Sequence, residues 1–152
     1  MYALAGFKVM KRIDFCAGHR LVRYEGKCKH LHGHTYTAEL CFIGILDTTG
    51  FVIDFNEITH KVKKWIDENW DHGVFVSDED TKLLDFLQDN AERHYIIKGN
   101  PTSEHIAREL FNVVNSVMAS VLIDGTKRLQ YVRIWESPSS FAEHFQELVQ
   151  PS

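Results

Sequence analysis

Residues 28–42 read CKHLHGHTYTAELCF, and this stretch decides the fold. In its second half every other side chain is apolar, which predicts a strand with one buried face: Tyr36, Ala38, Leu40 and Phe42. Successive side chains of a strand point to opposite faces, so His32 and His34 present two imidazoles to the same side. The strand is therefore expected to begin with two candidate metal ligands.

A third imidazole, His19, lies just upstream in FCAGHR at residues 15–20. Three histidines that leave the fourth coordination position open are the ligand set of a catalytic zinc rather than a structural one. A thiol, Cys28, lies close to them in the sequence, and a nearby dication favours the reactive thiolate. We therefore predict a Zn²⁺ site of His19, His32 and His34, with Cys28 free to react.

Two rival ligand sets stay open at this point. His30 shares strand parity with His32 and His34, so its ring is a competing ligand. A structural zinc would instead use Cys28, His32 and His34, with Cys16 as a fourth ligand. Structural sites usually recruit paired cysteines at short spacing, and because the chain has none, this set is the less favoured one.

The remaining periodicity gives the order strand, strand, helix, helix, strand, strand. Strands are expected at residues 7–15, 35–42, 51–53, 129–136 and 141–145. Helices are expected from a capping box at 54–57 to about residue 69, and from 101–103 to 124–126, with a small helix within 77–99. This order predicts an α+β fold in a single domain, residues 1–152, with two helices on one face of an antiparallel sheet. A small sheet exposes its edges, and association of subunits into a barrel is one way to cover them.

The composition argues against several function classes. The formal net charge is −4 with acids and bases interspersed, so no basic stripe indicates nucleic acid. No apolar run approaches the ~20 residues of a membrane span, and residues 1–6 are too short and weakly charged for a secretory signal. The three cysteines are odd in number, which argues against a disulfide framework and predicts a cytoplasmic protein with reduced thiols.

Two further positions have residue types that suit catalysis or binding. Asp71 precedes His72, and a carboxylate beside an imidazole can orient it for proton transfer; a solvated helix end explains the same pair. Glu136 ends an apolar β-segment, where its carboxylate can accept two parallel hydrogen bonds from an amidine-like edge. Taken alone, Glu136 is most simply an ordinary surface residue. The proton-transfer and binding roles therefore depend on the other motifs of the sequence.

These motifs form a set in a fixed order: FCAGHR at 15–20, Cys-x₃-His-Gly-His at 28–34, IDF at 53–55, DH at 71–72, PTSE at 101–104 and WESP at 135–138. Over roughly residues 7–145 the chain resembles the 6-pyruvoyltetrahydropterin synthase / 6-carboxytetrahydropterin synthase family. The resemblance implies the tunnelling fold, a ββααββ unit that oligomerises into a barrel, as a hexamer of two trimers or as a smaller ring.

The resemblance also implies roles for individual residues. By position, the zinc ligands are His19, His32 and His34, the catalytic thiol is Cys28, the acid/base pair is Asp71 with His72, and the carboxylate that anchors the pterin is Glu136. In the family the active site lies between subunits, so the Asp-His pair would face a thiol from a neighbouring chain.

One spacing selects a branch of the family. Three residues separate Cys28 from His32, as in the 6-carboxytetrahydropterin synthases of the 7-deazaguanine (queuosine) pathway, whereas the biopterin-pathway enzymes usually have five. The resemblance thus implies conversion of 7,8-dihydroneopterin triphosphate to 6-carboxy-5,6,7,8-tetrahydropterin, acetaldehyde and triphosphate. The alternatives are a 6-pyruvoyltetrahydropterin synthase and a non-catalytic module that binds pterin or metal. Trp70, His105 and Ser137 depart from the usual family pattern, but none removes a group on which the assignment depends.

Overall fold

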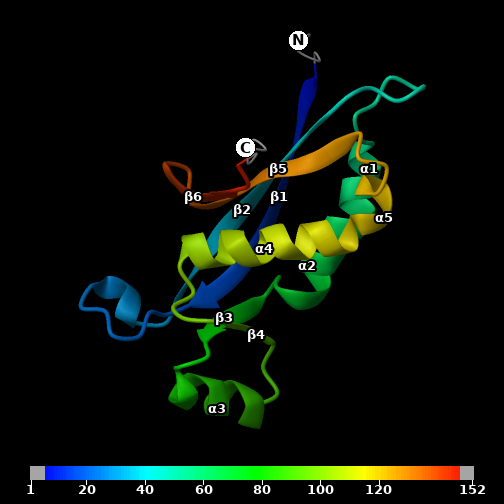
Figure 1. The fold of residues 1–152 in the computed structure, drawn as a ribbon. Coiled ribbons are helices and arrows are strands. Elements are labelled where there is room, and N and C mark those ends of the chain that lie inside the picture. The colour runs from blue at the N-terminus through cyan, green and yellow to red at the C-terminus, as the bar shows by residue number, and fades with distance from the viewer. Residues whose placement is uncertain (1–5, 148–152) are drawn as a thin grey trace, which may run out of the picture.

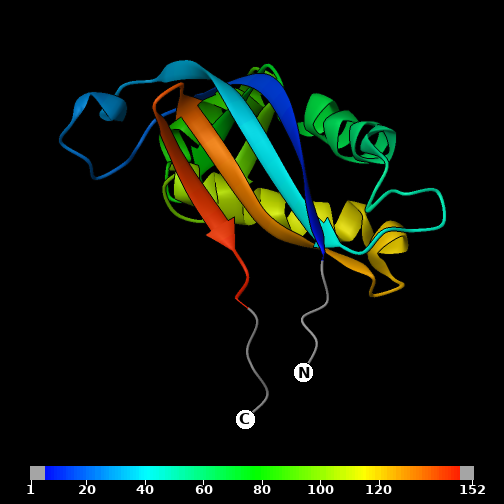
Figure 2. The ribbon, with the colours of Figure 1, turned by 90° about the horizontal axis from the view of Figure 1, so that it is seen from above.

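A six-stranded sheet forms the body of the protein in the computed structural model, which describes residues 6–147. The strand order is β4-β3-β1-β2-β5-β6, and Figures 1 and 2 show the sheet curling with its helices gathered on one face. The strands span Phe7–His19 (β1), His32–Gly44 (β2), Gly73–Ser77 (β3), His94–Ile97 (β4), Lys127–Ser137 (β5) and Ser140–Phe145 (β6). The α+β class is confirmed.

The sheet is mixed, which corrects the expectation of an antiparallel one. β1, β2, β5 and β6 pair antiparallel as predicted, but β3 pairs parallel to β1 and β4 parallel to β3. Both added strands are short, so period-two alternation gives little signal for them. β3 is joined to β1 at a corner where the His72 N–H donates to the Cys16 carbonyl at 2.7 Å.

The strand expected at residues 51–53 is absent from the described structure, and this prediction was wrong. Val52 and Ile53 are buried but belong to no strand. Asp54 caps the next helix by accepting a hydrogen bond from the Asn56 N–H, which puts Ile53 and Ile58 at the two positions of a hydrophobic staple. Both are core residues. The apolar run therefore anchors a helix start rather than extending a sheet.

The two predicted helices are confirmed as helical stretches on one face of the sheet. The first consists of Phe55–Ile58 (α1), a π-helical segment Thr59–Lys63 and Lys64–Asn69 (α2). The second consists of Ser103–Val117 (α4), capped by the Thr102 side chain, and Ala119–Leu122 (α5). The small helix is Thr81–Asp89 (α3). In the described part of the chain no helix combines the length and apolar character that crossing a bilayer requires.

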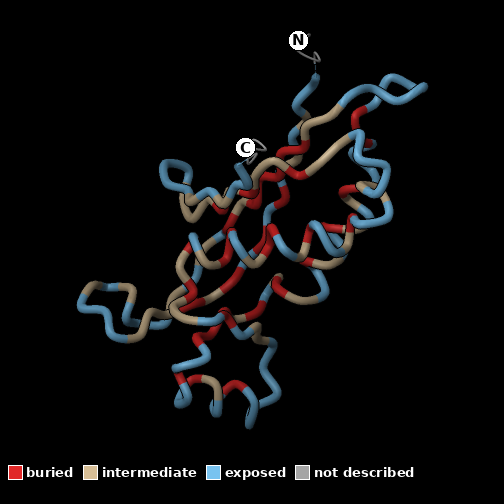
Figure 3. The backbone as a smooth tube through the Cα atoms, in the orientation of Figure 1, coloured by how far each residue is buried: buried red, intermediate tan, exposed pale blue. Residues whose placement is uncertain are grey.

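The core lies between the helices and the sheet, where Figure 3 shows the buried backbone. Ile106, Leu110 and Val114 of α4 are fully buried and belong to one cluster with the inward residues of β1, β2 and β5. Burial of such aliphatic side chains contributes ~1.5–3 kcal/mol each, which is what holds α4 on the sheet.

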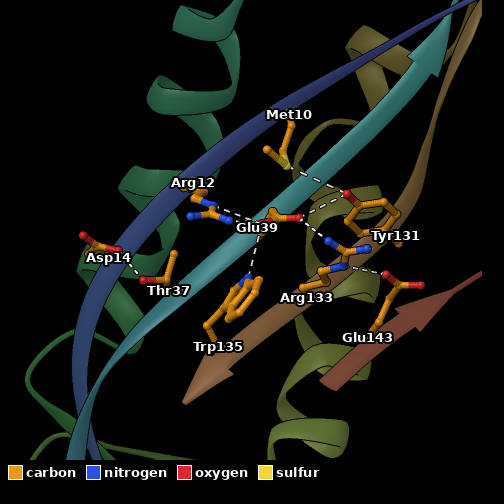
Figure 4. A network of polar contacts seen from close by, with 9 residues as sticks. All are labelled: Met10, Arg12, Asp14, Thr37, Glu39, Tyr131, Arg133, Trp135 and Glu143. Carbon is orange, nitrogen blue, oxygen red and sulfur yellow. Dashed lines mark hydrogen bonds and ion pairs between the residues drawn. The ribbon is translucent and has the colours of Figure 1, made fainter. Parts of the chain in front are cut away.

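The opposite face of the sheet is polar and centres on Glu39, which is only 1% exposed. Its carboxylate accepts hydrogen bonds from Arg12, Tyr131, Arg133 and Trp135 at 3.0–3.2 Å (Figure 4). Burial raises the pKa of Glu39, but these donors outweigh it and leave the pKa below its usual range. The charge of Glu39 on β2 is thus compensated by donors from two neighbouring strands, and the network ties β1, β2 and β5 together.

Candidate metal centre and active site

Three imidazoles converge where β1 ends and β2 begins. His19 is directly paired with His32 across the two strands, and His34 lies two residues further along the same face of β2. One potential ligand atom from each ring lies within 4.8 Å of the others, and the ring centroids are 4.6–5.2 Å apart. Alternation along β2 and the register of β1 therefore bring these three side chains together.

The tautomers of two of these rings follow from their hydrogen bonds. His19 Nδ1 lies 2.8 Å from the Pro101 carbonyl oxygen, and His32 Nδ1 lies 2.7 Å from the His30 carbonyl oxygen. A carbonyl only accepts, so both Nδ1 atoms carry the hydrogen and both Nε2 atoms carry a lone pair. These Nε2 atoms face each other at 3.1 Å, an arrangement that a shared cation stabilises.

The third nitrogen completes a donor set suited to a metal ion. His34 Nε2 is buried and has no hydrogen-bond partner among the described residues. Burial lowers the pKa of His19, which keeps the ring in the neutral form that binds metals. The described residues thus fit a divalent ion with imidazole preference at His19, His32 and His34. His30 contributes its backbone carbonyl to this arrangement, and its exposed ring is not part of the cluster.

A cavity of about 270 Å³ adjoins the histidines. Its lining includes His19, Cys28, Ser103 and Glu136, which come from β1, the loop after it, the start of α4 and the end of β5. The Ser103 hydroxyl donates to Glu136 Oε2 at 2.8 Å, and Glu136 Oε1 lies 3.4 Å from His34 Nε2. A carboxylate, a thiol and one imidazole of the cluster, that of His19, therefore share one pocket, and His34 lies against its Glu136 carboxylate.

Tyr36 closes the inner side of this site. Its ring packs against those of His19 and His34, with centroids 6.0 and 5.3 Å away. The side chain is fully buried, and burial raises the pKa of Tyr36 above its ordinary value. Tyr36 therefore stays neutral and walls the cluster off from the core.

Asp71 and His72 form a second polar pair at the start of β3. His72 Nδ1 lies 2.9 Å from Asp71 Oδ2, and Asp71 Oδ1 accepts from the Cys16 N–H at 2.8 Å. Burial raises the pKa of Asp71, but the hydrogen bonds from Cys16 and His72 outweigh it and lower the pKa. The exposed His72 ring, on a backbone with φ of 60°, is thus held beside a charged carboxylate.

These features match a known family. The family model for 6-pyruvoyl tetrahydropterin synthase matches residues 8–147. The chain belongs to that family. A 6-carboxy-5,6,7,8-tetrahydropterin synthase of Rickettsia conorii is 33% identical over 138 residues, covering 90% of this chain and 98% of the relative. The enzyme of the same name from Haemophilus influenzae is 32% identical over 146 residues, covering 91% and 98%.

The fold of the 6-pyruvoyl tetrahydropterin synthase family is also present. The solved structure of the Plasmodium falciparum 6-pyruvoyl tetrahydropterin synthase superposes with a TM-score of 0.72 at 23% identity, covering 94% of this chain and 99% of that one. The chain therefore has the tunnelling fold, with β3 and β4 added to the ββααββ order.

Not every expected site residue of this family member lies in one place. Cys28 lines the cavity with His19 and Glu136, whereas His72 lines a separate hollow with Cys16, Thr35 and His34 of the cluster. Cys16 is exposed there, so the described residues do not place it with the histidines as a zinc ligand.

One contact within the cavity, between Ser103 and Glu136, does not follow from the sequence. In the sequence Ser103 indicates only a helix start, and its place in PTSE at residues 101–104 is the one signal that points to the site. The pairing of its hydroxyl with Glu136 joins residues 33 positions apart, so no local pattern reports it.

Proposed function

We propose that this protein is a zinc-dependent 6-carboxytetrahydropterin synthase, a lyase that acts on 7,8-dihydroneopterin triphosphate. Its products would be 6-carboxy-5,6,7,8-tetrahydropterin, acetaldehyde and triphosphate. The observation that carries the proposal is one cavity lined by His19 of the histidine cluster, by the Cys28 thiol and by the Glu136 carboxylate, in a chain whose 30–33% identical relatives have that enzyme name. The three free cysteines suit the reducing cytoplasm.

The three imidazoles would hold the zinc ion. His19 and His32 offer Nε2 lone pairs because their Nδ1 hydrogens are bonded to carbonyls, and His34 offers a buried Nε2 that makes no hydrogen bond among the described residues and lies 3.4 Å from Glu136 Oε1. When bound, zinc supplies Lewis-acid polarisation of the substrate's side-chain hydroxyl groups.

Glu136 would anchor the pterin ring. An ionised carboxylate accepts two parallel hydrogen bonds from an aminopyrimidinone edge, as it does from a guanidinium. The Ser103 hydroxyl holds one carboxylate oxygen, and thereby turns the group toward the cavity. Binding the ring here would direct the side chain of the substrate toward the histidines.

Cys28 would act on the substrate as a base. Its side chain lines the same cavity, and as the thiolate it would take a proton from the carbon chain of the substrate. Asp71 orients His72 through the 2.9 Å contact, so that His72 would return or relay a proton. Triphosphate leaves, and addition of one water molecule from the solvent with breakage of the carbon chain then yields the 6-carboxylate and acetaldehyde.

The two halves of this machinery would meet between subunits. Within one chain Cys28 and His72 line separate hollows, so a complete site would take Cys28 from one subunit and His72 from a neighbour. We therefore propose a homo-oligomer, either a hexamer of two trimers or a smaller ring, as the active form.

Incubation of the zinc-loaded protein with 7,8-dihydroneopterin triphosphate tests the proposal, with the pterin product identified by mass. 6-Carboxytetrahydropterin is the expected product. A 6-pyruvoyl product would place the chain in the biopterin-type branch while leaving the site assignments in force. Binding of the pterin without turnover would indicate a non-catalytic binding module.

A further inference from the structure

The loop of residues 20–31 carries Cys28 to the cavity, yet apolar packing does not hold it. None of its residues is buried, including those of the 3₁₀ helix Lys27–Lys29. Figure 1 shows this loop, in blue, extending away from the sheet and the helices. The position of the thiol therefore depends on polar contacts with the rest of the chain.

One residue outside the loop makes two of these contacts. The Val22 N–H donates to Asn100 Oδ1 at 2.8 Å, and Asn100 Nδ2 donates to the Val22 carbonyl at 2.9 Å. Beside Val22, the Leu21 N–H donates to the Cys28 carbonyl at 2.8 Å and so closes the loop. Hydrogen bonds thus connect Asn100, through Val22 and Leu21, to the backbone of Cys28.

Asn100 is itself held firmly at the entrance to α4. Its carbonyl oxygen lies 2.7 Å from His105 Nδ1 and accepts from the Thr102 N–H at 2.8 Å. The preceding Gly99 has a φ of +83°, which favours glycine, and its N–H donates to Asp78 Oδ1 at 2.8 Å. The amide of Asn100 is therefore a fixed point from which the loop is held.

The other side-chain contacts of the loop lie elsewhere along it, including the contact of His32 Nδ1 with the His30 carbonyl at 2.7 Å, where the loop runs into β2. Arg20 makes a bidentate pair with Asp80 at 2.6 and 2.7 Å, which fixes the first residue of the loop rather than its middle. Arg23 pairs with Glu79, but both side chains are exposed, so water screens this pair. Among the described side chains, Asn100 is the one that hydrogen-bonds to the residue beside Leu21 in the Leu21–Cys28 closure.

We propose that Asn100 is the positioning residue of Cys28. Asn100 does not line the cavity, so it acts through the loop rather than on a bound molecule. The next residue, Pro101, accepts the hydrogen bond from His19 Nδ1, so one dipeptide orients both a metal-ligand imidazole and the thiol. The proposal rests on the proposed function only in giving Cys28 a catalytic part.

Differential alkylation of the cysteines tests this proposal. Iodoacetamide labelling, followed by peptide mass, compares Cys28 with the exposed Cys16, which serves as an internal reference. Loss of two hydrogen bonds in Asn100→Ala should raise the Cys28-to-Cys16 labelling ratio on the order of tenfold. In turnover the same variant should lower kcat with little change in KM, because the Ser103 and Glu136 side of the cavity, where the pterin ring would bind, is unchanged.

Two further variants make the test specific. Asn100→Asp keeps the acceptor for the Val22 N–H but loses the donor, so its labelling ratio should lie between those of wild type and Asn100→Ala. Asn90→Ala is the matched control, because Asn90 Nδ2 donates only to the Phe86 carbonyl of its own helix end; its ratio should equal that of wild type.

A Cys28-to-Cys16 ratio that stays at the wild-type value in Asn100→Ala would overturn the proposal. If Asn100→Ala does not fold, the ratio in Asn100→Asp decides in its place, and no rise would again overturn it. Labelling needs no substrate. A wild-type protein without turnover would therefore refute the proposed function, but the labelling ratio would still test whether Asn100 positions Cys28.

Discussion

Substitution of Ser103 by alanine tests how the protein holds its proposed pterin anchor. The Ser103 hydroxyl donates to Glu136 at 2.8 Å, and the second carboxylate oxygen already lies 3.4 Å from His34. A hydrogen bond to a charged group contributes ~1.5–3 kcal/mol. The Glu136 side chain is 32% exposed, so solvent screening reduces this to roughly 1.4 kcal/mol, which is about tenfold in affinity.

Titration of the zinc-loaded protein with a dihydropterin, followed by fluorescence or calorimetry, measures this effect. We expect Kd to rise about tenfold in Ser103→Ala, with zinc content unchanged. Ser116→Ala is the matched control, because this serine lies on the exposed face of the same helix. An unchanged Kd in Ser103→Ala would refute the reasoning that Ser103 orients Glu136 for binding.

Three other predictions concern the thiol, the subunit arrangement and the acid stability. Cys28→Ala should keep its zinc while losing most turnover. A fall in zinc content measured by mass spectrometry would instead favour a structural zinc site in which Cys28 is a ligand. Co-expression of Cys28→Ala with His72→Ala chains should restore about a quarter of wild-type turnover, because random pairing rebuilds that share of sites; activity no higher than that of either variant alone would contradict a site shared between subunits. The Arg20 hydrogen bonds hold the pKa of Asp80 below its usual range although burial opposes them. Folding lowers this pKa, so the pair stabilises the fold fully above about pH 4 and is lost as the pH falls through the folded pKa. The midpoint of urea unfolding should therefore depend less on pH at acid pH in Asp80→Asn than in the wild type. The same pH dependence in both proteins would contradict this.

The sequence predicts those parts of the fold whose signals are local. Alternation along residues 35–42 and the apolar face of 106–121 lead directly to β2 and α4, because each pattern is set by the side of an element that is buried. The sequence does not predict β3 and β4, because these short strands form by pairing with residues far away in the sequence, such as Gly73 with Ala17. Residues 51–53 were misread since a staple before a helix and a short buried strand have the same apolar pattern.

In the candidate site, too, local patterns predict some features, whereas others depend on residues far apart in the sequence. The pairing of His32 and His34 follows from strand alternation, and His19 was named from its spacing and from the family resemblance. The carbonyls that set the two tautomers differ in how far away they lie. His30 is a neighbour of His32, but Pro101 lies 82 residues from His19, so its part depends on the path of the whole chain.

The molar ratio of acetaldehyde to triphosphate released from 7,8-dihydroneopterin triphosphate tests the central claim most directly. A 6-carboxytetrahydropterin synthase cuts the carbon chain once for each triphosphate it eliminates, so the ratio should be about one. The ratio should be about one for the zinc-loaded protein, and the release of both products should fall together in Cys28→Ala. Release of triphosphate without acetaldehyde would contradict the account.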